Sequence, residues 1–488
     1  MNRKIIKIII AALLFSLSFS VLAVQPSMAR GKINGFTANV MAPLKINLSD
    51  QEQVNSFKEQ LQNVKNIGVD AVSIDVWWGM VEGSGDQQFD WSYYDTMFKI
   101  ITDAGLQVQA IMSFHKCGGN VGDDVYIPIP SWIWAVAGPG GQYVNELYNP
   151  GNDEVVALWA SNPDAVNKQY IEFMDAFENH FAGYADKLQS INISCGPAGE
   201  CRYPSYNRYV IDGTTYGQGY PTRGYLYCYS DQAIAAFQDA IEEKYNSVKA
   251  LNNAWGTKLA SFSDVKPPSN GDSFFNIKDN TAYINAPYGR DFIDWYSSEM
   301  AEHGQNMLQC AIDAFDNQFT GIELEIKIPG VHWTMGDPTM PRSAEVCAGL
   351  LNSKLTVNVP ANGCGPGYST LLSAVQDMKP KAKKHHLMVY FTCLEMSNEN
   401  FYPAYSMASA LVFGVGEEAH GTGTGLIIKG ENALPPNGGS TWDHDGFWWN
   451  INNAISWCWY EGITILRVGD VADGAQRDYF SRLISDHK

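Results

Sequence analysis

Eight short apolar runs, separated by longer amphipathic stretches, constrain the fold of this 488-residue chain more than any other feature of its sequence. The runs are rich in β-branched residues and cover residues 36–42, 70–76, 106–114, 188–195, 320–328, 387–393, 425–430 and 463–468. Helical patterning covers residues 50–66, 165–182, 231–245 and 291–315. Apolar strands that alternate with helices indicate a parallel sheet covered on both faces. Because eight such strands close a barrel, we predict an α/β fold, a single (β/α)8 TIM barrel; an open doubly wound sheet is the alternative.

Polar and ionisable residues follow seven of the eight runs. They are Asp75, His115, Glu200, Lys327, His332, Thr392, Glu395, Glu431 and Arg467. In a (β/α)8 barrel, catalytic groups lie at the carboxyl ends of the strands, on the loops that lead to the helices. The sequence therefore predicts an active site on this face, built from long βα loops.

Two glutamates stand out because they would lie on opposite sides of an eight-stranded ring. Glu200 follows the fourth run and Glu431 follows the seventh. Hydrolysis of a glycosidic bond usually needs one carboxylic acid and a second carboxylate as base or nucleophile. Gly199 and Gly430, directly before them, would let the backbone approach a ligand closely. Taken alone, either glutamate could equally be a salt-bridged loop residue.

The first 29 residues have the pattern of a secretory signal peptide. Arg3, Lys4 and Lys7 precede an apolar stretch over residues 8–24, and small residues follow it. Cleavage after Ala23 or Ala29 fits this pattern, and an uncleaved membrane anchor is the alternative. We therefore expect a secreted, extracellular protein whose residues 30–488 form one catalytic domain.

Charge and cysteine content exclude several classes of protein. The net charge is −19, which disfavours nucleic acid and anionic membranes as partners and suits a neutral or cationic ligand. The nine cysteines include no Cys-x-x-Cys pair, so a zinc cage or a thioredoxin-like motif is not expected. Because the number is odd, at least one thiol is free or pairs with another chain.

Six motifs resemble β-amylase, glycoside hydrolase family 14, over nearly the whole chain. They are GPAGECRYPSY (196–206), GENAL (430–434), FTCLEM (391–396), SFHKCGGNVGD (113–123), DVWWG (75–79) and KIPGVHW (327–333). The resemblance implies a (β/α)8 enzyme that removes β-maltose from the non-reducing ends of α-1,4-glucans such as starch, glycogen and maltodextrins, with inversion. It further implies a monomer of the bacterial secreted type, without an appended starch-binding module and without a cofactor for the chemistry.

The resemblance also implies roles for individual residues. Glu200 matches the general acid and Glu431 the general base, whereas Glu395 matches a supporting position. Thr392 matches an inner-loop residue that stabilises Glu200 once it has lost its proton. The implied sugar contacts are Asp75, His115, Asp123 in a lid loop, Lys327, His332, Asn432, Ala433 and Arg467.

Some bacterial relatives hold a structural calcium ion, and the resemblance implies Glu82, Asp86, Gln87 and Glu172 as its ligands here. Their hard oxygen atoms suit calcium. The chain departs from the family at Cys201, where relatives usually carry Leu or Met. Residues 353–367 and 441–450 look like insertions.

Two alternative functions remain open from the residues. A retaining barrel glycosidase also places glutamates after the fourth and seventh strands, but its strand-four acid usually follows an asparagine rather than a glycine. A catalytically inactive glucan-binding protein is the other alternative, although both glutamates are present.

Overall fold

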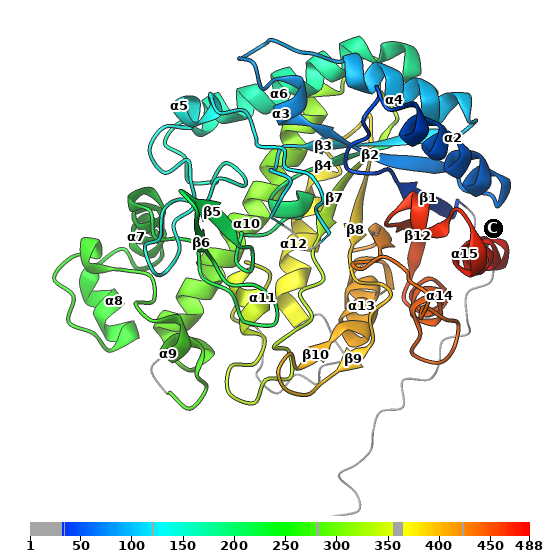
Figure 1. Cartoon of the computed structure of the whole chain (residues 1–488). Coiled ribbons are helices and arrows are strands. Elements are labelled where there is room, and N and C mark those ends of the chain that lie inside the picture. Colours follow the sequence, from blue (N-terminus) through cyan, green and yellow to red (C-terminus); the bar gives the residue numbers. More distant parts are fainter. Residues whose placement is uncertain (1–31, 34, 120–121, 280–282, 355–364, 422–423) are drawn as a thin grey trace, which may run out of the picture.

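The computed structural model describes residues 32–33, 35–119, 122–279, 283–354, 365–421 and 424–488. The predicted signal peptide, residues 1–29, lies outside these residues, as does most of the 353–367 segment. Eight parallel strands form a closed barrel in the order β1-β12-β11-β8-β7-β4-β3-β2 (Figure 1). The strands are β1 (Thr37–Met41), β2 (Ala71–Trp77), β3 (Gln107–Ser113), β4 (Leu188–Ile193), β7 (Glu323–Ile328), β8 (His386–Phe391), β11 (Ile427–Glu431) and β12 (Tyr460–Ile465). The predicted barrel is confirmed, and the open doubly wound sheet is excluded because the pairing of β1 with β2 closes the ring and leaves none of the eight strands at an edge.

Helices surround the barrel and follow its strands along the chain. The main ones are α2 (Gln51–Asn66), α4 (Ser92–Asp103), α6 (Pro163–His180), α10 (Pro287–Ala314), α12 (Gly365–Met378), α13 (Ala408–Gly416), α14 (Phe447–Trp457) and α15 (Gly474–His487). α2 shows why the sequence forms them: Asp50 caps its first turn by accepting from the backbone N–H groups of Glu52 and Gln53. Its buried residues are Val54, Phe57, Leu61 and Val64, which recur at helical spacing.

The loops at the carboxyl ends of the strands carry the remaining elements. These are α3 (Trp78–Val81), α5 (Ile133–Ala137), β5 (Tyr209–Ile211), β6 (Thr214–Tyr216), α7 (Asp231–Tyr245), α8 (Val248–Trp255), α9 (Gly271–Phe275), α11 (Ser343–Cys347), β9 (Asn398–Glu399) and β10 (Ser406–Met407). The connection from β4 to β7 contains five of them before α10 begins, and it extends well to one side of the barrel (Figure 1). The predicted long βα loops are therefore present.

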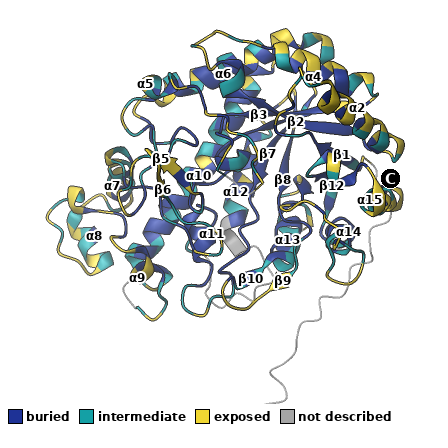
Figure 2. Ribbon diagram, in the orientation of Figure 1, coloured by how far each residue is buried: buried dark blue, intermediate teal, exposed yellow. Residues whose placement is uncertain are grey.

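The barrel strands are almost entirely buried, as their apolar sequences predict (Figure 2). The barrel nevertheless contains polar side chains that the apolar pattern did not indicate. Gln109 donates to Ser190 Oγ at 3.1 Å and to Glu325 Oε2 at 2.8 Å. Burial raises the pKa of Glu325 to about 7. These hydrogen bonds join three neighbouring strands inside the barrel, where an unpaired polar group would be costly.

Eight cysteines, all except Cys364, lie in the described residues, and each is buried with a free thiol.

Among the residues described here, none of the helices combines the length and apolar character needed to cross a bilayer.

Candidate active site

The carboxyl ends of the barrel strands open onto a cavity of about 470 Å³. The predicted residues that line it are Asp75, His115, Asp123, Glu200, Lys327, Thr392, Glu431, Asn432, Ala433 and Arg467. These residues are spread over nearly 400 positions of sequence, and the parallel strands bring them together because all their carboxyl ends meet at one face. The predicted position of the site is therefore supported by one continuous cavity.

Glu200 stands on a tight loop directly after β4. Ala198 and Gly199 both have positive φ, 57° and 78°, which turns the chain sharply before the glutamate. After the turn, Glu200 forms an isolated parallel bridge with Lys327, and the Cys201 N–H donates to the Lys327 carbonyl at 2.7 Å. This backbone pairing fixes Glu200 against the end of β7.

Two donors hold the carboxylate of Glu200. Arg202 Nε lies 2.7 Å from Oε2, and the Tyr206 hydroxyl donates to the same oxygen at 3.2 Å. The Arg202 guanidinium also lies over the Tyr206 ring, 3.9 Å from its centroid. Because Arg202 is fully buried, this charge-assisted contact is strong and fixes the orientation of the carboxylate.

Glu431 is the last residue of β11 and pairs with Lys327. The Lys327 Nζ lies 2.8 Å from Glu431 Oε1, and both side chains are more than nine-tenths buried. Burial raises the pKa of Glu431, Lys327 opposes that rise, and the nearby charge of Glu200 adds to it. Burial lowers the pKa of Lys327, but the carboxylates of Glu431 and Glu200 outweigh it and raise that pKa above its usual value. Lys327 therefore stays charged and favours the ionised form of Glu431.

The glycines before the two glutamates are needed for different reasons, packing at Gly430 and backbone conformation at Gly199. A Cβ on Gly430 would lie 2.5 Å from Leu394 Cδ1, so this position needs glycine to pack against a neighbouring loop. A Cβ on Gly199 would make ordinary contact with the His115 ring, and the positive φ is what favours glycine there. The expectation that Gly430 makes room for a ligand is wrong, because its open side is filled by Leu394.

Asp75 and His115 present polar atoms at the base of the cavity. Asp75 accepts from the Ser113 hydroxyl at 2.7 Å, and burial raises the pKa of its carboxyl while Arg467 opposes the rise. His115 Nδ1 lies 2.8 Å from Ser194 Oγ. Burial lowers the pKa of His115 to about 3, so its ring is neutral at moderate pH.

The loop after β11 is held by a third buried glutamate. Glu395 Oε1 accepts from the N–H groups of Ala433 and Leu434 at 3.0 and 2.8 Å. Asn432 Nδ2 donates to the carbonyls of Leu434 and Leu466, and its Oδ1 accepts from the Leu466 N–H. Burial raises the pKa of Glu395 to about 7. These contacts fit the supporting role expected of Glu395, because its carboxylate is occupied by backbone donors.

Three predicted residues have contacts that the sequence did not indicate. His332 is not part of the cavity lining; its Nδ1 lies 2.7 Å from Ser406 Oγ and its ring packs against Trp333, which does line the cavity. The Thr392 hydroxyl accepts from the Gly330 N–H at 2.7 Å. Asp123 Oδ2 accepts from the N–H groups of Gly118 and Gly119. The predicted effect of Thr392 on Glu200 stays a prediction.

Three of the four predicted calcium ligands lie together. The Gln87 backbone N–H donates to Glu82 Oε1 at 2.7 Å, and its side-chain amide donates to Glu172 Oε1 at 3.1 Å. Burial raises the pKa of Glu82, and the charges of Asp86 and Glu172 add to that rise. Glu172 Oε2 is buried and has no hydrogen-bond partner. Within the described residues, no three His, Cys, Asp or Glu side chains form a metal cluster by themselves. A calcium ion here would therefore need neutral oxygen ligands as well.

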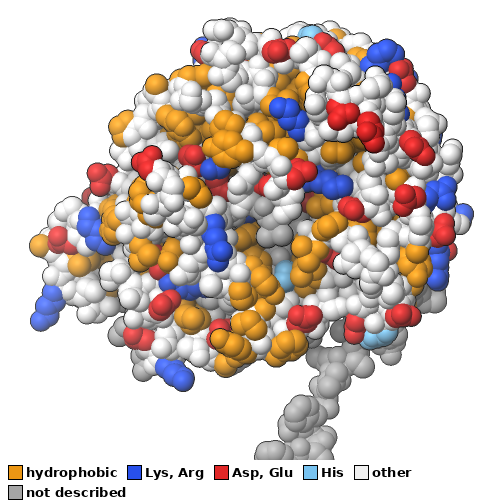
Figure 3. Space-filling view, in the orientation of Figure 1, with side chains coloured by type: hydrophobic (Ala, Val, Ile, Leu, Met, Phe, Trp, Pro, Cys, Tyr) orange, Lys and Arg blue, Asp and Glu red, His pale blue; other side chains and the backbone are white. Residues whose placement is uncertain are grey.

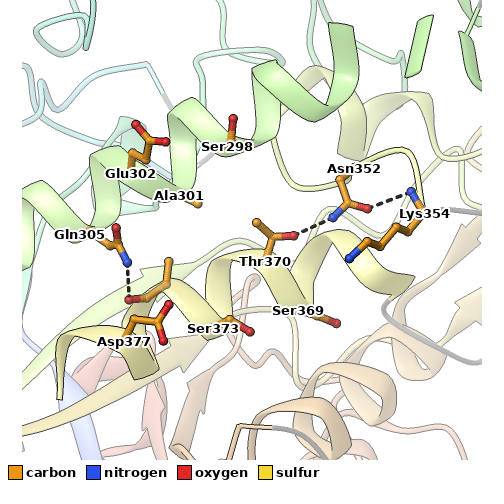
Figure 4. Close-up of a pocket in the computed structure, with 11 residues that line it drawn as sticks. Ser298, Ala301, Glu302, Gln305, Asn352, Lys354, Ser369, Thr370, Ser373 and Asp377 are labelled. Carbon is orange, nitrogen blue, oxygen red and sulfur yellow. Dashed lines mark hydrogen bonds between the residues drawn. The ribbon is translucent and has the colours of Figure 1, made fainter. Parts of the chain in front are cut away.

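A second cavity, of about 440 Å³, lies between α10 and α12 (Figure 4). Polar contacts cross-link its walls: Gln305 donates to the Ala374 carbonyl at 3.0 Å, and Asn352 donates to the Thr370 hydroxyl at 2.7 Å. None of the predicted catalytic residues lines it. It is a groove between packed helices, and none of its lining residues belongs to a barrel strand.

Comparison with known proteins decides the family. A sequence model of Glycosyl hydrolase family 14 matches residues 39–486. The chain belongs to this family. The family 14 match covers both glutamates and every residue named above for the cavity, so the resemblance seen in the six motifs is confirmed.

Relatives within family 14 are similar over most of their length. A protein named thermophilic beta-amylase, from Thermoanaerobacterium thermosulfurigenes, is 40% identical over 90% of this chain and 71% of its own. A beta-amylase from Cytobacillus firmus is 39% identical over 89% of this chain and 83% of its own. The crystal structure of the catalytic domain of a beta-amylase from Paenibacillus polymyxa has a TM-score of 0.79 and 37% identity, covering 94% of this chain and all of that one.

Arg202, Tyr206, Trp333 and Tyr220 also line the cavity of this family 14 member, and of these four only Tyr220 was given no place near the site by the sequence. Arg202 and Tyr206 follow Glu200 within the same motif, GPAGECRYPSY, so the signal was present in the sequence. Their direct contact with the Glu200 carboxylate depends on how the loop folds back over β4, which no spacing rule gives.

Proposed function

We propose that this protein hydrolyses α-1,4-glucosidic bonds of starch and related glucans, and that it releases β-maltose from non-reducing ends by an inverting mechanism. The observation that carries the proposal is the pair of carboxylates in one cavity with different surroundings. Glu200 is held by Arg202 and Tyr206, whereas Glu431 is held by Lys327. Carboxylates in different surroundings can act as acid and base in one reaction. Family membership and the similarity to proteins named beta-amylase support the substrate class.

In this mechanism Glu200 gives its proton to the glycosidic oxygen as the bond from that oxygen to the anomeric carbon breaks. Glu431, whose ionised form Lys327 favours, takes a proton from a water molecule on the opposite face of the sugar. That water attacks the anomeric carbon, so the configuration changes from α to β. The proton lost by Glu200 and the proton gained by Glu431 balance, and solvent restores both groups after each turnover.

Polar groups around the two glutamates would bind the sugar hydroxyls. Asp75, the neutral ring of His115 and the Lys327 ammonium offer acceptors and donors within the cavity. A site of this kind fixes orientation by a few well-placed polar groups among apolar walls. A protein with a net charge of −19 suits a neutral glucan better than an anionic ligand.

The products provide a direct test of the proposed reaction. Chromatography of an early digest of soluble starch is expected to show maltose as the main product, accompanied by a rise in reducing ends. A mixture of long and short oligosaccharides would contradict exo action. If reducing ends do not rise at all, the protein is an inactive glucan-binding protein instead.

Lys327→Met is expected to move the acidic limb of the kcat/KM pH profile to higher pH by about 1 unit or more. The base must be ionised, so activity is lost as pH falls through the pKa of Glu431. Lys327 lowers that pKa, and so does Arg467, whereas burial and Glu200 raise it. Without Lys327 the pKa of Glu431 is higher, so Glu431 stays protonated, and the enzyme inactive, up to a higher pH.

The matched control is Lys244→Met. Lys244 pairs with Asp291 at 2.7 Å outside the cavity, so its removal should leave the limb in place. If the acidic limb of the pH profile stays at the same pH in Lys327→Met, this lysine does not control the ionisation of Glu431.

We also propose that Glu82, Asp86, Gln87 and Glu172 bind a structural calcium ion. The unpaired, buried Glu172 Oε2 and the mutual repulsion of the carboxylates support a cation here. The Gln87 amide would have to turn its oxygen toward the ion, because in the structure its nitrogen donates to Glu172. The ion would supply positive charge that stabilises the loop, with no part in the chemistry.

Calcium at about 100 times its Kd is expected to stabilise the folded protein by about 2.7 kcal/mol. The measurement is the melting temperature after treatment with chelator, with and without added calcium. In Glu172→Gln, most of the difference in melting temperature between the protein with and without calcium should disappear. Equal melting temperatures with and without calcium would refute the site.

We infer in addition that the protein acts outside the cell, as residues 1–29 indicate. Mass spectrometry of the exported protein should find a chain that begins at Val24 or Arg30. An unprocessed chain retained in the membrane would contradict this.

A further inference from the structure

Three large aromatic side chains are exposed, one in the cavity lining and two in a segment that is hydrogen-bonded to the residues flanking Trp333. Tyr220 is 52% exposed, Phe401 63% and Tyr402 78%. We call these three residues the aromatic rim. Phe401 and Tyr402 lie between β9 and β10, and hydrophobic side chains extend from the central hollow of the molecule down to this region (Figure 3). Exposed apolar groups that gather in this way usually mark a binding surface.

One residue of the rim, Tyr220, is connected to the interior of the cavity through ring contacts. Tyr206, which donates to Glu200, meets Trp333 edge to face at 4.7 Å between centroids. Trp333 in turn meets Tyr220 edge to face at 5.5 Å. Tyr206, Trp333 and Tyr220 all line the cavity. A line of aromatic side chains therefore extends from the proposed acid to the surface.

The segment that carries Phe401 and Tyr402 is hydrogen-bonded to the two residues that flank Trp333, which lines the cavity. The Met407 N–H donates to the His332 carbonyl at 2.9 Å, and the Thr334 N–H donates to the Ala404 carbonyl at 2.7 Å. Burial raises the pKa of the Tyr220 hydroxyl, and the charge of Glu399 adds to the rise, which indicates that Glu399 lies near that hydroxyl. These contacts fix the backbone of the segment that carries the two exposed rings, so less of the segment has to be ordered when a ligand stacks on them.

We propose that the aromatic rim binds the part of a long α-glucan that extends out of the cavity on the leaving-group side of the cleaved bond. The inference rests on the proposed function. An enzyme that cuts a disaccharide from the chain end must leave the remainder of the chain outside the site, and that remainder passes the mouth. Glucose rings have apolar C–H faces and hydroxyl edges, and tyrosine offers a flat apolar face with a polar tip. A neutral glucan also suits a surface on a strongly acidic protein.

The test compares a short and a long substrate in the full-length enzyme. In the double variant Phe401→Ala/Tyr402→Ala, kcat/KM for short-chain amylose is expected to fall by about tenfold. With maltotetraose, which the rim would hardly reach, kcat/KM should stay within about twofold. Tyr402→Phe keeps the ring and should retain most of the preference for long chains. Tyr148→Ala is the matched control, since Tyr148 is 65% exposed and its ring contacts Tyr229 rather than a residue of the aromatic rim.

Equal losses on the two substrates, or no loss on either, would overturn the rim proposal while leaving the proposed function intact. Failure of the proposed function has a different signature, because neither substrate would then release maltose. In that case retardation in amylose-containing gels still tests the rim: the double variant should migrate faster than the unmodified protein. Unchanged migration would refute glucan binding by the rim.

Discussion

Glu200→Gln is expected to lower kcat on soluble starch by about 10³- to 10⁴-fold, the upper part of the range for loss of a general acid. Glutamine is nearly isosteric and can still accept from Arg202 and Tyr206, which both contact Glu200 Oε2. It cannot give a proton to the departing glycosidic oxygen. Because the contacts are kept, maltose binding and the melting temperature should change little, so the loss would be one of chemistry.

A change of leaving group separates loss of the acid from other damage. A maltoside with a nitrophenol leaving group needs little protonation, so Glu200→Gln should lose far less activity on it than on starch. The two substrates are compared by initial rates under identical conditions. Equal losses on both substrates, or more than about a tenth of normal activity on starch, would remove Glu200 from the role of acid.

Glu431→Gln is expected to lower kcat by at least about 10³-fold on starch and on the nitrophenyl maltoside alike. Activation of water is needed whatever the leaving group, so the second substrate should offer no rescue. The change also leaves the buried Lys327 ammonium without its carboxylate partner at 2.8 Å, so some stability should be lost as well. A maltose-induced rise in melting temperature would show that the variant still folds and binds.

Glu395→Gln is the matched control for Glu431→Gln. Glu395 is also a buried glutamate beside the cavity, but its carboxylate accepts from the N–H groups of Ala433 and Leu434. A glutamine carbonyl can still accept such hydrogen bonds, so the expected loss is smaller than about tenfold. If Glu395→Gln were as damaging as Glu431→Gln, the assignment of the base would have to be reconsidered.

The barrel was predictable because its strands are buried on both faces and read as apolar runs. The last strand shows the limit of that signal: residues 463–468 were predicted, whereas β12 spans Tyr460–Ile465. The strand begins earlier because Gly462 pairs with Thr37 at the closure of the barrel, and this pairing depends on a residue more than 400 positions away. Gln109 and Glu325 were not predicted as interior residues. Their side chains form a hydrogen bond with each other only because β4 pairs with both β3 and β7.

The positions of the site residues were easier to predict than their contacts. A position after a strand places a side chain at the catalytic face, which located Glu200, Lys327 and Glu431. Contacts depend on how separate loops meet. Trp333 occupies the wall that was expected for His332, and Leu394 fills the space beside Gly430. Neither arrangement follows from sequence spacing alone.

The anomeric form of the first product tests the account most directly. Proton NMR of a fresh digest of soluble starch distinguishes α- from β-maltose before mutarotation mixes them. If Glu431 activates a water molecule opposite the proton donor Glu200, β-maltose must appear first and the α form must grow in slowly. Initial α-maltose would contradict the account, because it would mean that the configuration is retained through a covalent intermediate.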